Sequence, residues 1–466
     1  MNRIERQEVS IKKAIDSNLH GLLHLCVRFG KTRIGLKLYQ YAISIGLKPL
    51  ILVPSLTIKN GWILEDQKST NIQPIIVTIS QLLSVSKSFN VDLLIVDEIH
   101  KFTSDERYNL INKGLIKYNR LIGLTATLPL GNNLTKLKTI VPVIDHISES
   151  EAITNNWVSQ FVEYNISLEL SDNDKYTYVK LTESISEYLQ TFANLENYIT
   201  HGGIKLFNST MDLLYGCFRG ANVRGFPHIS SEIIAKTLIE VMRQGKEDEF
   251  WNLSNIKEQG SAFARKVDLR NDILIANRIK LQAVLDIYDT LKVPTLCFND
   301  SIVFSDIIAE KVNEKYPNQA MSYHSKLESK PLIDNLTGEY YRYVGGTKAG
   351  QPKLFSKAKQ LEYAILAIEH GVMSFISTVK ALDEGITIPN IECLITTAGT
   401  FNPIQYEQRT GRAKTYVSSD KIAKIYNLFF NDFEYEGKVY KSRDKTKLLS
   451  RQTNSSNVKN ISLSDV

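Results

Sequence analysis

The first 145 or so residues alternate short apolar runs with amphipathic stretches. The apolar runs are continuous and rich in β-branched residues, a pattern typical of strands buried on both faces of a parallel sheet. They occupy residues 49–55, 74–80, 91–98 and 120–127. Helical spacing between the runs, as over 33–45, predicts the alternation of strand and helix that a doubly wound α/β domain has.

The pattern changes near Ser171, where apolar residues begin to recur at helical spacing and where Ser171 or Asp172 could cap a helix. The first apolar positions are Tyr178, Leu181, Ile185, Tyr188, Leu189 and Phe192. The helical pattern continues with interruptions to about residue 265. Strand-like runs then return at 293–300, 372–378 and 391–397, so a helical region separates two α/β domains.

These patterns predict an α/β fold with two parallel-sheet domains and a mainly helical accessory region. We expect the first domain at 1–150, a linker and the accessory region at 151–270, and the second domain at 271–440. Residues 441–466 are basic and then rich in Ser and Asn, which predicts a flexible tail. Residues 326–359 are polar and rich in Gly and Lys, which predicts a solvated loop rather than a clamp on DNA.

Composition narrows the class of protein without fixing its function. A chain of 466 residues is too long for one core, and 43% hydrophobic with 23% charged residues is ordinary for a globular protein. The net charge of +6 permits a polyanionic partner but does not require one. No run of eighteen apolar residues and no apolar signal segment is present, so we expect a cytoplasmic protein without a membrane partner. The four cysteines are scattered, which favours reduced thiols over a zinc site.

The stretch Gly30-Lys31-Thr32 has the composition of a phosphate loop. It follows an apolar segment and precedes an amphipathic helix, so backbone N–H groups and a helix N-terminus would face the phosphates of a nucleotide. Lys31 would reach the β- and γ-phosphate oxygens, and the Thr32 hydroxyl would bind Mg²⁺. Leu25 and Arg28 stand where phosphate loops usually have glycine or another small residue.

A pair of acids, Asp97 and Glu98, closes a run of five apolar residues. Both carboxylates are therefore expected at the carboxyl end of a buried strand, the edge of an open α/β sheet where ligands bind. Asp97 would hold the Mg²⁺ and its water, Glu98 would polarise the attacking water, and His100 could relay the nucleotide state. Thr125 and Thr127, at the end of the next strand, could hydrogen-bond the acids. The alternative is a strand end with solvated acids.

Near the end of the second domain, the stretch 406–414 supplies Gln408, Arg409 and Arg412. Arginines three residues apart lie on one face of a helix, so the second domain could present a guanidinium group to a γ-phosphate. An arginine finger of this kind is worth roughly 10³–10⁵ in rate. The alternative is a basic surface helix.

In this order the four motifs resemble those of superfamily 2 helicases and translocases of the DExH type. The resemblance covers about 4–130 and 270–415, and is closest in pattern to Rad25-like, restriction-subunit-like and phage UvsW-like DNA helicases. It implies two RecA-like domains with ATP bound between them and Mg²⁺ as cofactor. Many relatives carry a third arginine where this chain has Thr415, so Arg412 is expected to carry most of the finger role, with Arg409 second.

The resemblance also implies roles for residues outside the four motifs. Gln7 matches the glutamine that reads the adenine edge. Residues 51–62 resemble the family's motif Ia, including a tryptophan (Trp62) seen in several members that act on DNA. Further nucleotide-binding positions are Gly30, Arg33 and Gly385. Contacts to the nucleic-acid backbone are implied for Pro54, Ser55, Thr78, Ser80 and Thr378.

Within the helical region, the stretch 215–226 interleaves aromatic residues with Arg219 and Arg224. Such a segment could stack on bases or hold a junction. The alternative is an irregular connection between helices with its aromatic side chains packed inside.

The motifs and the resemblance predict an ATP-dependent DNA helicase or translocase that remodels branched DNA, such as forks and Holliday junctions. We expect a monomeric or weakly associating protein with single-stranded and branched DNA as partners, in the host cytoplasm if the source is a phage. An RNA helicase or the motor subunit of a restriction or remodelling complex is the alternative within this class. A phosphate-loop switch or phosphotransferase would leave the arginine motif unexplained, and the retained Lys31, Asp97, Glu98 and Arg412 argue against an inactive binding module.

Overall fold

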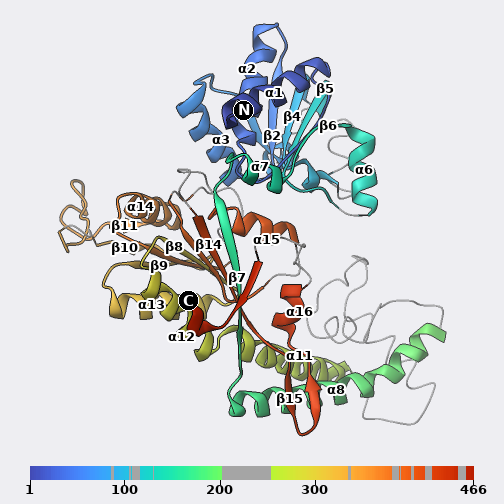
Figure 1. Ribbon diagram of the computed structural model, residues 1–466, viewed down its shortest axis with the longest axis vertical. Coiled ribbons are helices and arrows are strands. Elements are labelled where there is room, and N and C mark those ends of the chain that lie inside the picture. Colours follow the sequence, from blue (N-terminus) through green and yellow to red (C-terminus); the bar gives the residue numbers. More distant parts are fainter. Residues whose placement is uncertain are drawn as a thin grey trace. The chain divides into compact units, whose positions relative to one another are not determined.

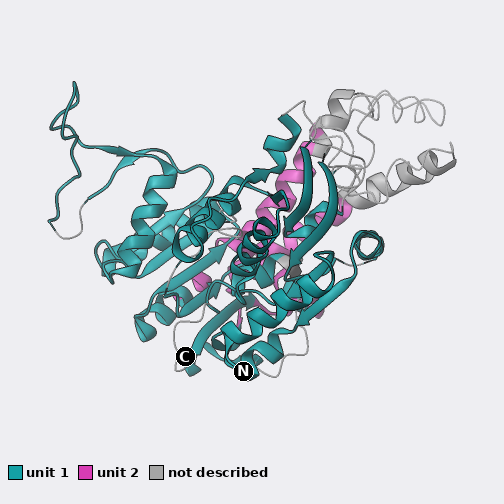
Figure 2. Ribbon diagram, turned by 90° about the horizontal axis from the view of Figure 1, so that it is seen from above, with its two compact units in different colours: residues 1–166, 283–429, 447–466 teal, residues 167–282, 430–446 magenta. Residues whose placement is uncertain are grey.

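The computed structural model describes residues 1–84, 89–103, 107, 116–129, 131–201, 253–333, 337–379, 388, 390–399, 403–414, 422–449 and 458–466. The chain forms two compact units, shown in different colours in Figure 2. The first unit comprises 1–166, 283–429 and 447–466, and the second comprises 167–282 and 430–446. None of the described helices combines the length and the apolar character that a membrane-spanning helix needs.

The first unit contains a six-stranded parallel sheet in the order β3-β2-β4-β5-β1-β6. Its strands are β1 (Gly21–Leu25), β2 (Pro49–Val53), β3 (Ile76–Thr78), β4 (Phe89–Asp97), β5 (Ile116–Thr125) and β6 (Val143–Ile147). Each of the four apolar runs in this part of the sequence overlaps one of these strands, although β4 and β5 begin two and four residues before their runs. Figure 1 shows the sheet with helices on both of its faces.

Helices cover both faces of this six-stranded sheet. Alternate residues of each strand face opposite sides, so apolar side chains are available to pack against helices on either face. Along β4, Leu93 and Ile95 belong to one core cluster, which also holds residues of α1, α2 and α3. Leu94 and Val96 belong to a second cluster on the other face. The helices are α1 (Arg3–Asp16), α2 (Lys31–Ser44), α3 (Leu56–Ser69), α4 (Ile79–Ser84), the 3₁₀ helix η1 (Ile99–Phe102), α6 (Asn132–Ile140) and α7 (Glu149–Thr154).

A seven-stranded sheet follows, in the order β17-β7-β14-β13-β8-β12-β9. Its strands are β7 (Gln160–Leu168), β8 (Thr295–Asn299), β9 (Ala320–Tyr323), β12 (Phe375–Val379), β13 (Cys393–Thr396), β14 (Ile422–Phe430) and β17 (Val458–Ile461). Its helices are α12 (Arg278–Leu291), α13 (Ile302–Lys315), α14 (Lys357–Glu369) and α15 (Pro403–Thr410). The predicted α/β fold with two parallel-sheet domains is thus confirmed.

The second unit is mainly helical. It contains α8 (Asp172–His201) and α11 (Leu253–Ile275), a hairpin of β15 (Phe433–Tyr435) and β16 (Lys438–Tyr440), and α16 (Arg443–Leu449), which begins in it. Ser171 caps α8 by accepting a hydrogen bond from the Asp174 N–H (3.2 Å). A buried ion pair between Lys280 and Asp444 ties α12 to α16 within this unit.

Two segments differ from the expectations. The first is β7, a strand of the second sheet contributed by 151–270, the region expected to be linker and helix. The second is 441–466, expected as a flexible tail, whose described residues include α16, β17 and the short 3₁₀ helix η2 (Leu463–Asp465). Strand β17 is ordered by pairing in parallel with β7, where the Asn165 amide donates to Asn460 (3.2 Å). Such long-range pairing leaves no periodic signal in a polar sequence.

A buried ionic cluster fixes α1 against β6. The Arg6 guanidinium makes two hydrogen bonds to the Asp145 carboxylate (2.8 and 2.9 Å), and Ser10 and Lys13 add a third and a fourth (2.7 and 2.6 Å). Burial alone would raise the pKa of Asp145, but the hydrogen bonds from Arg6, Lys13 and Ser10 outweigh it and hold that pKa at about 2. Helix α1 is therefore held to the sheet by a carboxylate that stays charged.

Replacing Asp145 with Asn should destabilise the first unit, because Arg6 keeps its charge while losing its buried counter-ion. We expect a loss of about 3 kcal/mol in the free energy of unfolding near pH 7, measured by urea unfolding. Since the pKa of Asp145 is lower in the folded state, its contribution is fully present above the unfolded pKa of about 4. The difference between wild type and variant should shrink as the pH falls through about 2.

The matched control is Asp16→Asn on the same helix, where the side chain is exposed. It should change the free energy of unfolding by less than about 0.5 kcal/mol. Equal effects of the two substitutions would show that the buried pair does not hold α1.

Candidate functional site

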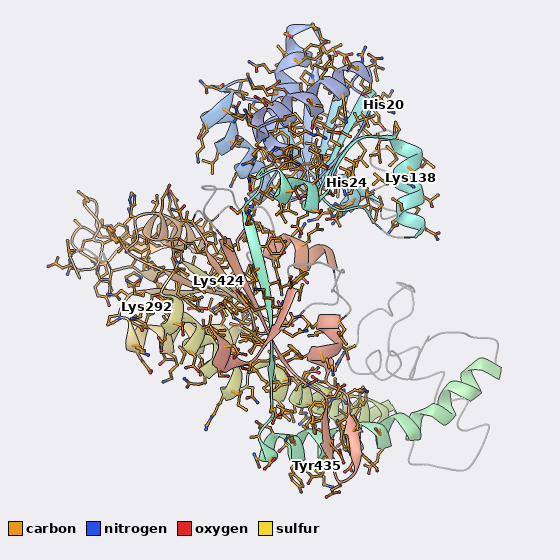
Figure 3. All side chains as sticks on the ribbon, viewed as in Figure 1. His20, His24, Lys138, Lys292, Lys424 and Tyr435 are labelled. Carbon is orange, nitrogen blue, oxygen red and sulfur yellow. The ribbon has the colours of Figure 1, made fainter. Side chains whose placement is uncertain are left out.

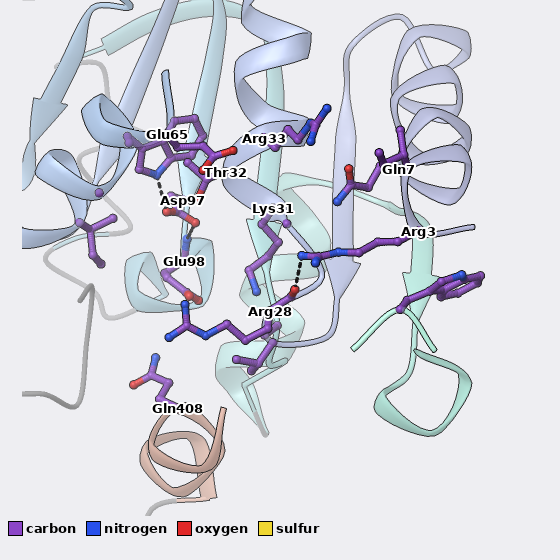
Figure 4. Close-up of a pocket in the computed structure, with 18 of the residues that line it drawn as sticks. Arg3, Gln7, Arg28, Lys31, Thr32, Arg33, Glu65, Asp97, Glu98 and Gln408 are labelled. Atoms are coloured by element: carbon purple, nitrogen blue, oxygen red, sulfur yellow. Dashed lines mark hydrogen bonds between the residues drawn. The ribbon is translucent and has the colours of Figure 1, made fainter. Parts of the chain in front are cut away.

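A pocket of about 1000 Å³ opens at the carboxyl ends of β1, β4 and β5. Residues of α1, the loop after β1, α3 and the end of β4 line it, and Gln408 and Arg412 from the second sheet domain complete it. Figure 4 shows Lys31, Thr32, Asp97, Glu98, Arg28 and Gln408 around a common space. The volume suits a ligand of nucleotide size.

The loop between β1 and α2 is held by side chains of α1. Arg28 and Gly30 both have positive φ angles (66° and 106°), which turn the chain sharply before the helix. Arg3 donates to the carbonyl oxygens of Arg28 (2.6 Å) and Phe29 (3.2 Å), and the Gln7 amide donates to Phe29 O (2.7 Å). Because these two carbonyls are turned toward α1, the opposite side of the loop is available to present N–H groups to the pocket.

Helix α2 begins at Lys31 without a capping side chain. Its N-cap is Gly30, where a Cβ atom would lie 2.4 Å from the Gln7 amide nitrogen. The first N–H groups of a 14-residue helix therefore face the pocket, where they and the helix dipole favour an anion. The Lys31 ammonium lies 3.4 Å from Leu25 O, and Thr32 and Arg33 also line the pocket.

The Asp97 carboxylate at the end of β4 is held on both oxygens. The indole N–H of Trp62 on α3 donates to Oδ2 (2.7 Å), and the backbone N–H of Glu98 donates to Oδ1 (3.0 Å). Trp62 is fully buried, and a Cβ atom at Gly35 of α2 would lie 2.3 Å from its ring. Glycine at this position of α2 is therefore required for the indole to reach Asp97.

The surroundings of Asp97 shift its protonation. Burial and the neighbouring Glu98 charge raise its pKa to about 6, while the Trp62 hydrogen bond and the Lys31 charge act in the opposite direction. A nearby cation stabilises the charged form of such a buried carboxylate, because it replaces the solvation that the carboxylate lost on burial.

A chain of polar contacts leads from Glu98 toward α15. His100 Nδ1 lies 3.3 Å from the Glu98 carboxylate and 2.8 Å from the Thr125 hydroxyl. Thr125 donates to Thr127 O (2.8 Å), and the Thr127 hydroxyl donates to Glu407 of α15 (2.9 Å). The two threonine hydroxyls thus contact His100 and Glu407 instead of the acid pair. They connect the ends of β4 and β5 with α15.

The two arginines that follow Gln408 have different surroundings. Arg412 lines the pocket. Arg409 is buried beside the Phe298 ring (5.0 Å) and lies 4.0 Å from the Asp300 carboxylate, and it is not among the residues that line the pocket. Arg412 is therefore the guanidinium that α15 and its following turn offer to a bound ligand.

Arg28 brings a further guanidinium to the pocket from the loop itself. Its Nε donates to Gly411 O (3.1 Å), next to Arg412. Burial, followed by the charges of Arg412 and Arg3, lowers the pKa of Arg28 to about 9, so it is still protonated at neutral pH. Cations that repel one another in a closed space are stabilised by a polyanion.

His24 on β1, labelled in Figure 3, lies beside the loop. Its Nε2 is 3.0 Å from Ala126 O and its Nδ1 is 2.8 Å from Nδ1 of His146. Burial and the His146 ring lower its pKa, so it is neutral at pH 7. His24 therefore adds no charge to the pocket.

The residues expected to contact nucleic acid lie near the carboxyl ends of strands in both sheets. Pro54 and Ser55 follow β2, and Ser55 caps α3 by accepting a hydrogen bond from Ile58 N–H (3.4 Å). Thr78 ends β3 and Ser80 is exposed at the start of α4. The buried Thr378 hydroxyl donates to Tyr323 O (2.8 Å), so it links β12 to β9 within the sheet.

Three of the residues expected to bind a ligand, Arg219, Arg224 and Gly385, lie outside the described residues. Several residues that the sequence did not assign to the site line it, among them Arg3, Arg28 and Trp157, and Glu407 contacts it through the Thr127 hydroxyl. Only Arg28 gave a signal, because a large side chain interrupts a loop that is usually small.

Comparisons with known proteins agree with this geometry. Residues 295–414 match the family model described as "Helicase conserved C-terminal domain", and residues 63–130 match the model described as "Type III restriction enzyme, res subunit". The sequence matches none of the curated proteins.

Among solved structures, the helicase domain of Pyrococcus furiosus Hef aligns with a TM-score of 0.52 at 14% identity, covering 96% of this chain and 98% of that one. The Type ISP restriction-modification enzyme LlaBIII bound to DNA (TM-score 0.49, 12% identity, 98% and 31% covered) and S. cerevisiae Dbp5 bound to RNA and ADP BeF3 (0.49, 9%, 96% and 86%) are more distant. The two domain matches indicate a nucleic-acid-dependent ATPase with helicase domains, and the two parallel sheets have the fold of a helicase domain.

Proposed function

We propose that the chain hydrolyses ATP in this pocket to drive movement along DNA and to remodel branched DNA. The observation that carries the proposal is the convergence in one pocket of the α2 N-terminus, the acid pair and Arg412. These are the groups that bind, activate and stabilise a transferring phosphoryl group.

Each group has a separate task in the proposed reaction. Lys31 and the N–H groups of the loop bind the phosphates, and Glu98 orients the water that attacks the γ-phosphorus. Arg412 stabilises the charge that develops on the phosphoryl oxygens, and Arg28 adds a second guanidinium on the side of the loop. Gln7 lines the same pocket, and its amide is engaged with Phe29 O, so it would read the adenine edge with its remaining hydrogen-bonding groups.

The donor set also fits Mg²⁺. Thr32 and Asp97 line the same pocket, and a hydroxyl and a carboxylate oxygen are hard ligands that Mg²⁺ accepts alongside phosphate oxygens and water. When bound, the ion would neutralise phosphate charge. The hydrogen bond from Trp62 restricts the Asp97 carboxylate to one orientation, so this ligand loses little rotational freedom when the ion binds.

Two connections couple ATP to nucleic acid in this proposal. Helix α3 begins at Ser55, an expected backbone contact, and carries Trp62, which holds Asp97. The contacts from Glu98 through His100 and the threonines end at Glu407 on α15. A movement of either helix would therefore change the position of a group that acts on the γ-phosphate.

DNA is proposed as the substrate on two grounds. The first domain matches the model of a restriction-enzyme subunit, a class that acts on DNA. Trp62 in motif Ia resembles a tryptophan of members that act on DNA, and the motifs typical of the commonest RNA helicases are absent from the sequence.

The test is to compare ATPase stimulation by single-stranded DNA, duplex DNA, a fork, a four-way junction and RNA at one fixed salt concentration. We expect the fork and the junction to stimulate most and RNA least. Lys31→Ala, which removes the phosphate-binding ammonium, is the control and should show no turnover with any of them. Stimulation by RNA above that by every DNA would overturn the choice of DNA, and turnover by Lys31→Ala would overturn the site.

Arg412→Ala should lower kcat by about 10³-fold, because the guanidinium acts on charge that develops only in the transition state. The KM for ATP should change by less than about threefold. Steady-state ATPase assays with saturating single-stranded DNA measure both constants. Arg412→Lys keeps the charge but loses the planar fork, and should recover only part of the rate. Equal losses in kcat and in ATP affinity would contradict a finger role.

Trp62→Phe should raise the Mg²⁺ concentration needed for nucleotide binding by about 10-fold or more, because Asp97 loses the donor that orients it. Fluorescence anisotropy of a labelled ATP analogue, titrated with Mg²⁺, measures this without turnover. The matched control is Trp157→Phe, which removes an indole N–H that donates to Met1 O (3.1 Å) in the same pocket. An equal Mg²⁺ requirement in the two variants would show that Trp62 only fills space.

A further inference from the structure

Strand β7 carries a buried carboxylate beside α15. The Glu163 side chain accepts hydrogen bonds from the Tyr406 hydroxyl of α15 and from the Asn427 amide of β14 (2.6 Å). These are its side-chain partners within the described part of the chain, and neither is a cation. A carboxylate taken out of water is unfavourable unless donors replace the solvent, so the two donors restrict it to one position.

The contacts of Glu163 extend to β17. The Asn427 amide also lies 3.1 Å from Asn165 Oδ1 on β7, and the Asn165 amide donates to Asn460 on β17 (3.2 Å). We call Glu163, Asn165, Tyr406, Asn427 and Asn460 the Glu163 cluster. Figure 1 shows β7 beside β14, and the cluster joins the three neighbouring strands β17, β7 and β14. The Glu163 carboxylate is therefore a fixed point against which α15 can be placed.

Strand β7 also contacts the turn that follows α15, at residues 411–414. The Ser159 N–H, one residue before β7, donates to Lys414 O (3.4 Å), and the Lys414 ammonium group lies over the Phe161 ring (3.9 Å). Phe161 and Glu163 are alternate residues of the strand, so their side chains lie on the same face. The segment 406–414 is thus held by β7 at both of its ends.

Arg412 lies within the segment that β7 holds. Its backbone N–H donates to Arg409 O (3.0 Å), so the turn continues the hydrogen bonding of α15. Tyr406 and Arg409 are three residues apart on one face of α15, and they contact Glu163 of β7 and Phe298 of β8. While these residues hold α15 to its own sheet, Arg412 lines the pocket.

We infer that Glu163 is a positioning residue for Arg412: its carboxylate fixes α15 through the Tyr406 hydroxyl and thereby sets where the guanidinium group stands. The inference rests on the proposed function, because it takes Arg412 to act on the transferring phosphoryl group. A displacement of about 1 Å at such a group can cost about 10²-fold in rate. The alternative is that the Glu163 cluster only stabilises the second sheet domain, which predicts no selective loss of rate.

Tyr406→Phe tests the inference through the loss of one hydroxyl group. We expect kcat to fall about tenfold at saturating single-stranded DNA while the KM for ATP stays within twofold, because Arg412 is displaced and the phosphate loop is intact. The matched control is Tyr164→Phe, which removes a hydroxyl from the opposite face of β7, where the Tyr164 ring stacks on Tyr426 (5.0 Å). The control should keep kcat within twofold of wild type.

Combining Tyr406→Phe with Arg412→Ala separates positioning from a structural effect. A residue that acts through Arg412 has nothing left to position once the guanidinium group is gone, so the two losses should not add. The further loss of rate caused by Tyr406→Phe should then be less than twofold, measured by single-turnover hydrolysis of labelled ATP. A cluster that only stabilises the domain should lower the rate by the same factor in both backgrounds.

Two substitutions of Glu163 test the carboxylate itself. Glu163→Gln keeps an oxygen that accepts from the Tyr406 hydroxyl and should retain at least a third of the wild-type kcat. Glu163→Ala removes the acceptor and should lower kcat at least tenfold. Thermal unfolding checks that both variants are folded, and Tyr406→Phe with its control decides the question if Glu163→Ala is not.

The outcomes separate this inference from the proposed function. A wild-type kcat in Arg412→Ala would overturn the finger role, and the inference with it. With the expected loss in Arg412→Ala, an unchanged kcat in Tyr406→Phe would overturn the inference alone. So would an equal loss from Tyr406→Phe in both backgrounds, or equal rates for folded Glu163→Gln and Glu163→Ala.

Discussion

The parallel register of the six-stranded sheet is the constraint on which the site depends. Parallel pairing brings the carboxyl ends of β1, β4 and β5 to one edge of the sheet. The phosphate loop, the acid pair and the threonines therefore become neighbours although they lie far apart in the sequence. Strands buried on both faces keep that edge rigid, because each strand is held by core side chains above and below. The site then needs only polar residues at the end of each strand or in the loop that follows it.

This constraint explains why the sequence predicts so much of the site. Asp97, Glu98 and Thr125 stand at the end of an apolar run, and Lys31 follows one after a loop of three residues. Local pattern locates such strand ends well. Gln408 and Arg412 were predicted from motif spacing, and they too line the pocket. The position of each of these residues depends on its own helix or strand, and residues nearby in the sequence determine where that element begins and ends.

The contacts that the sequence did not predict are those between distant segments. The Trp62 indole reaches Asp97 only because Gly35, on a third element, leaves room for its ring. Arg409 was expected to share the finger role, second to Arg412, but it is buried beside the Phe298 ring and near the Asp300 carboxylate. Strand β17 has a polar sequence and is ordered by pairing with β7. In each case the decisive partner lies tens to hundreds of residues away, where periodicity carries no information.

The unusual phosphate loop follows from the same logic. Leu25 replaces a usual glycine without cost, because it is the last residue of β1 and its side chain lies in the core. Arg28 adopts a positive φ, which costs a side-chain-bearing residue roughly 1–2 kcal/mol. The hydrogen bonds from Arg3 to the Arg28 and Phe29 carbonyls and from Arg28 to Gly411 offset that cost. Arginine in place of a small residue at position 28 gives the loop a guanidinium beside Arg412. The chain has Thr415 at the position where many relatives carry a third arginine.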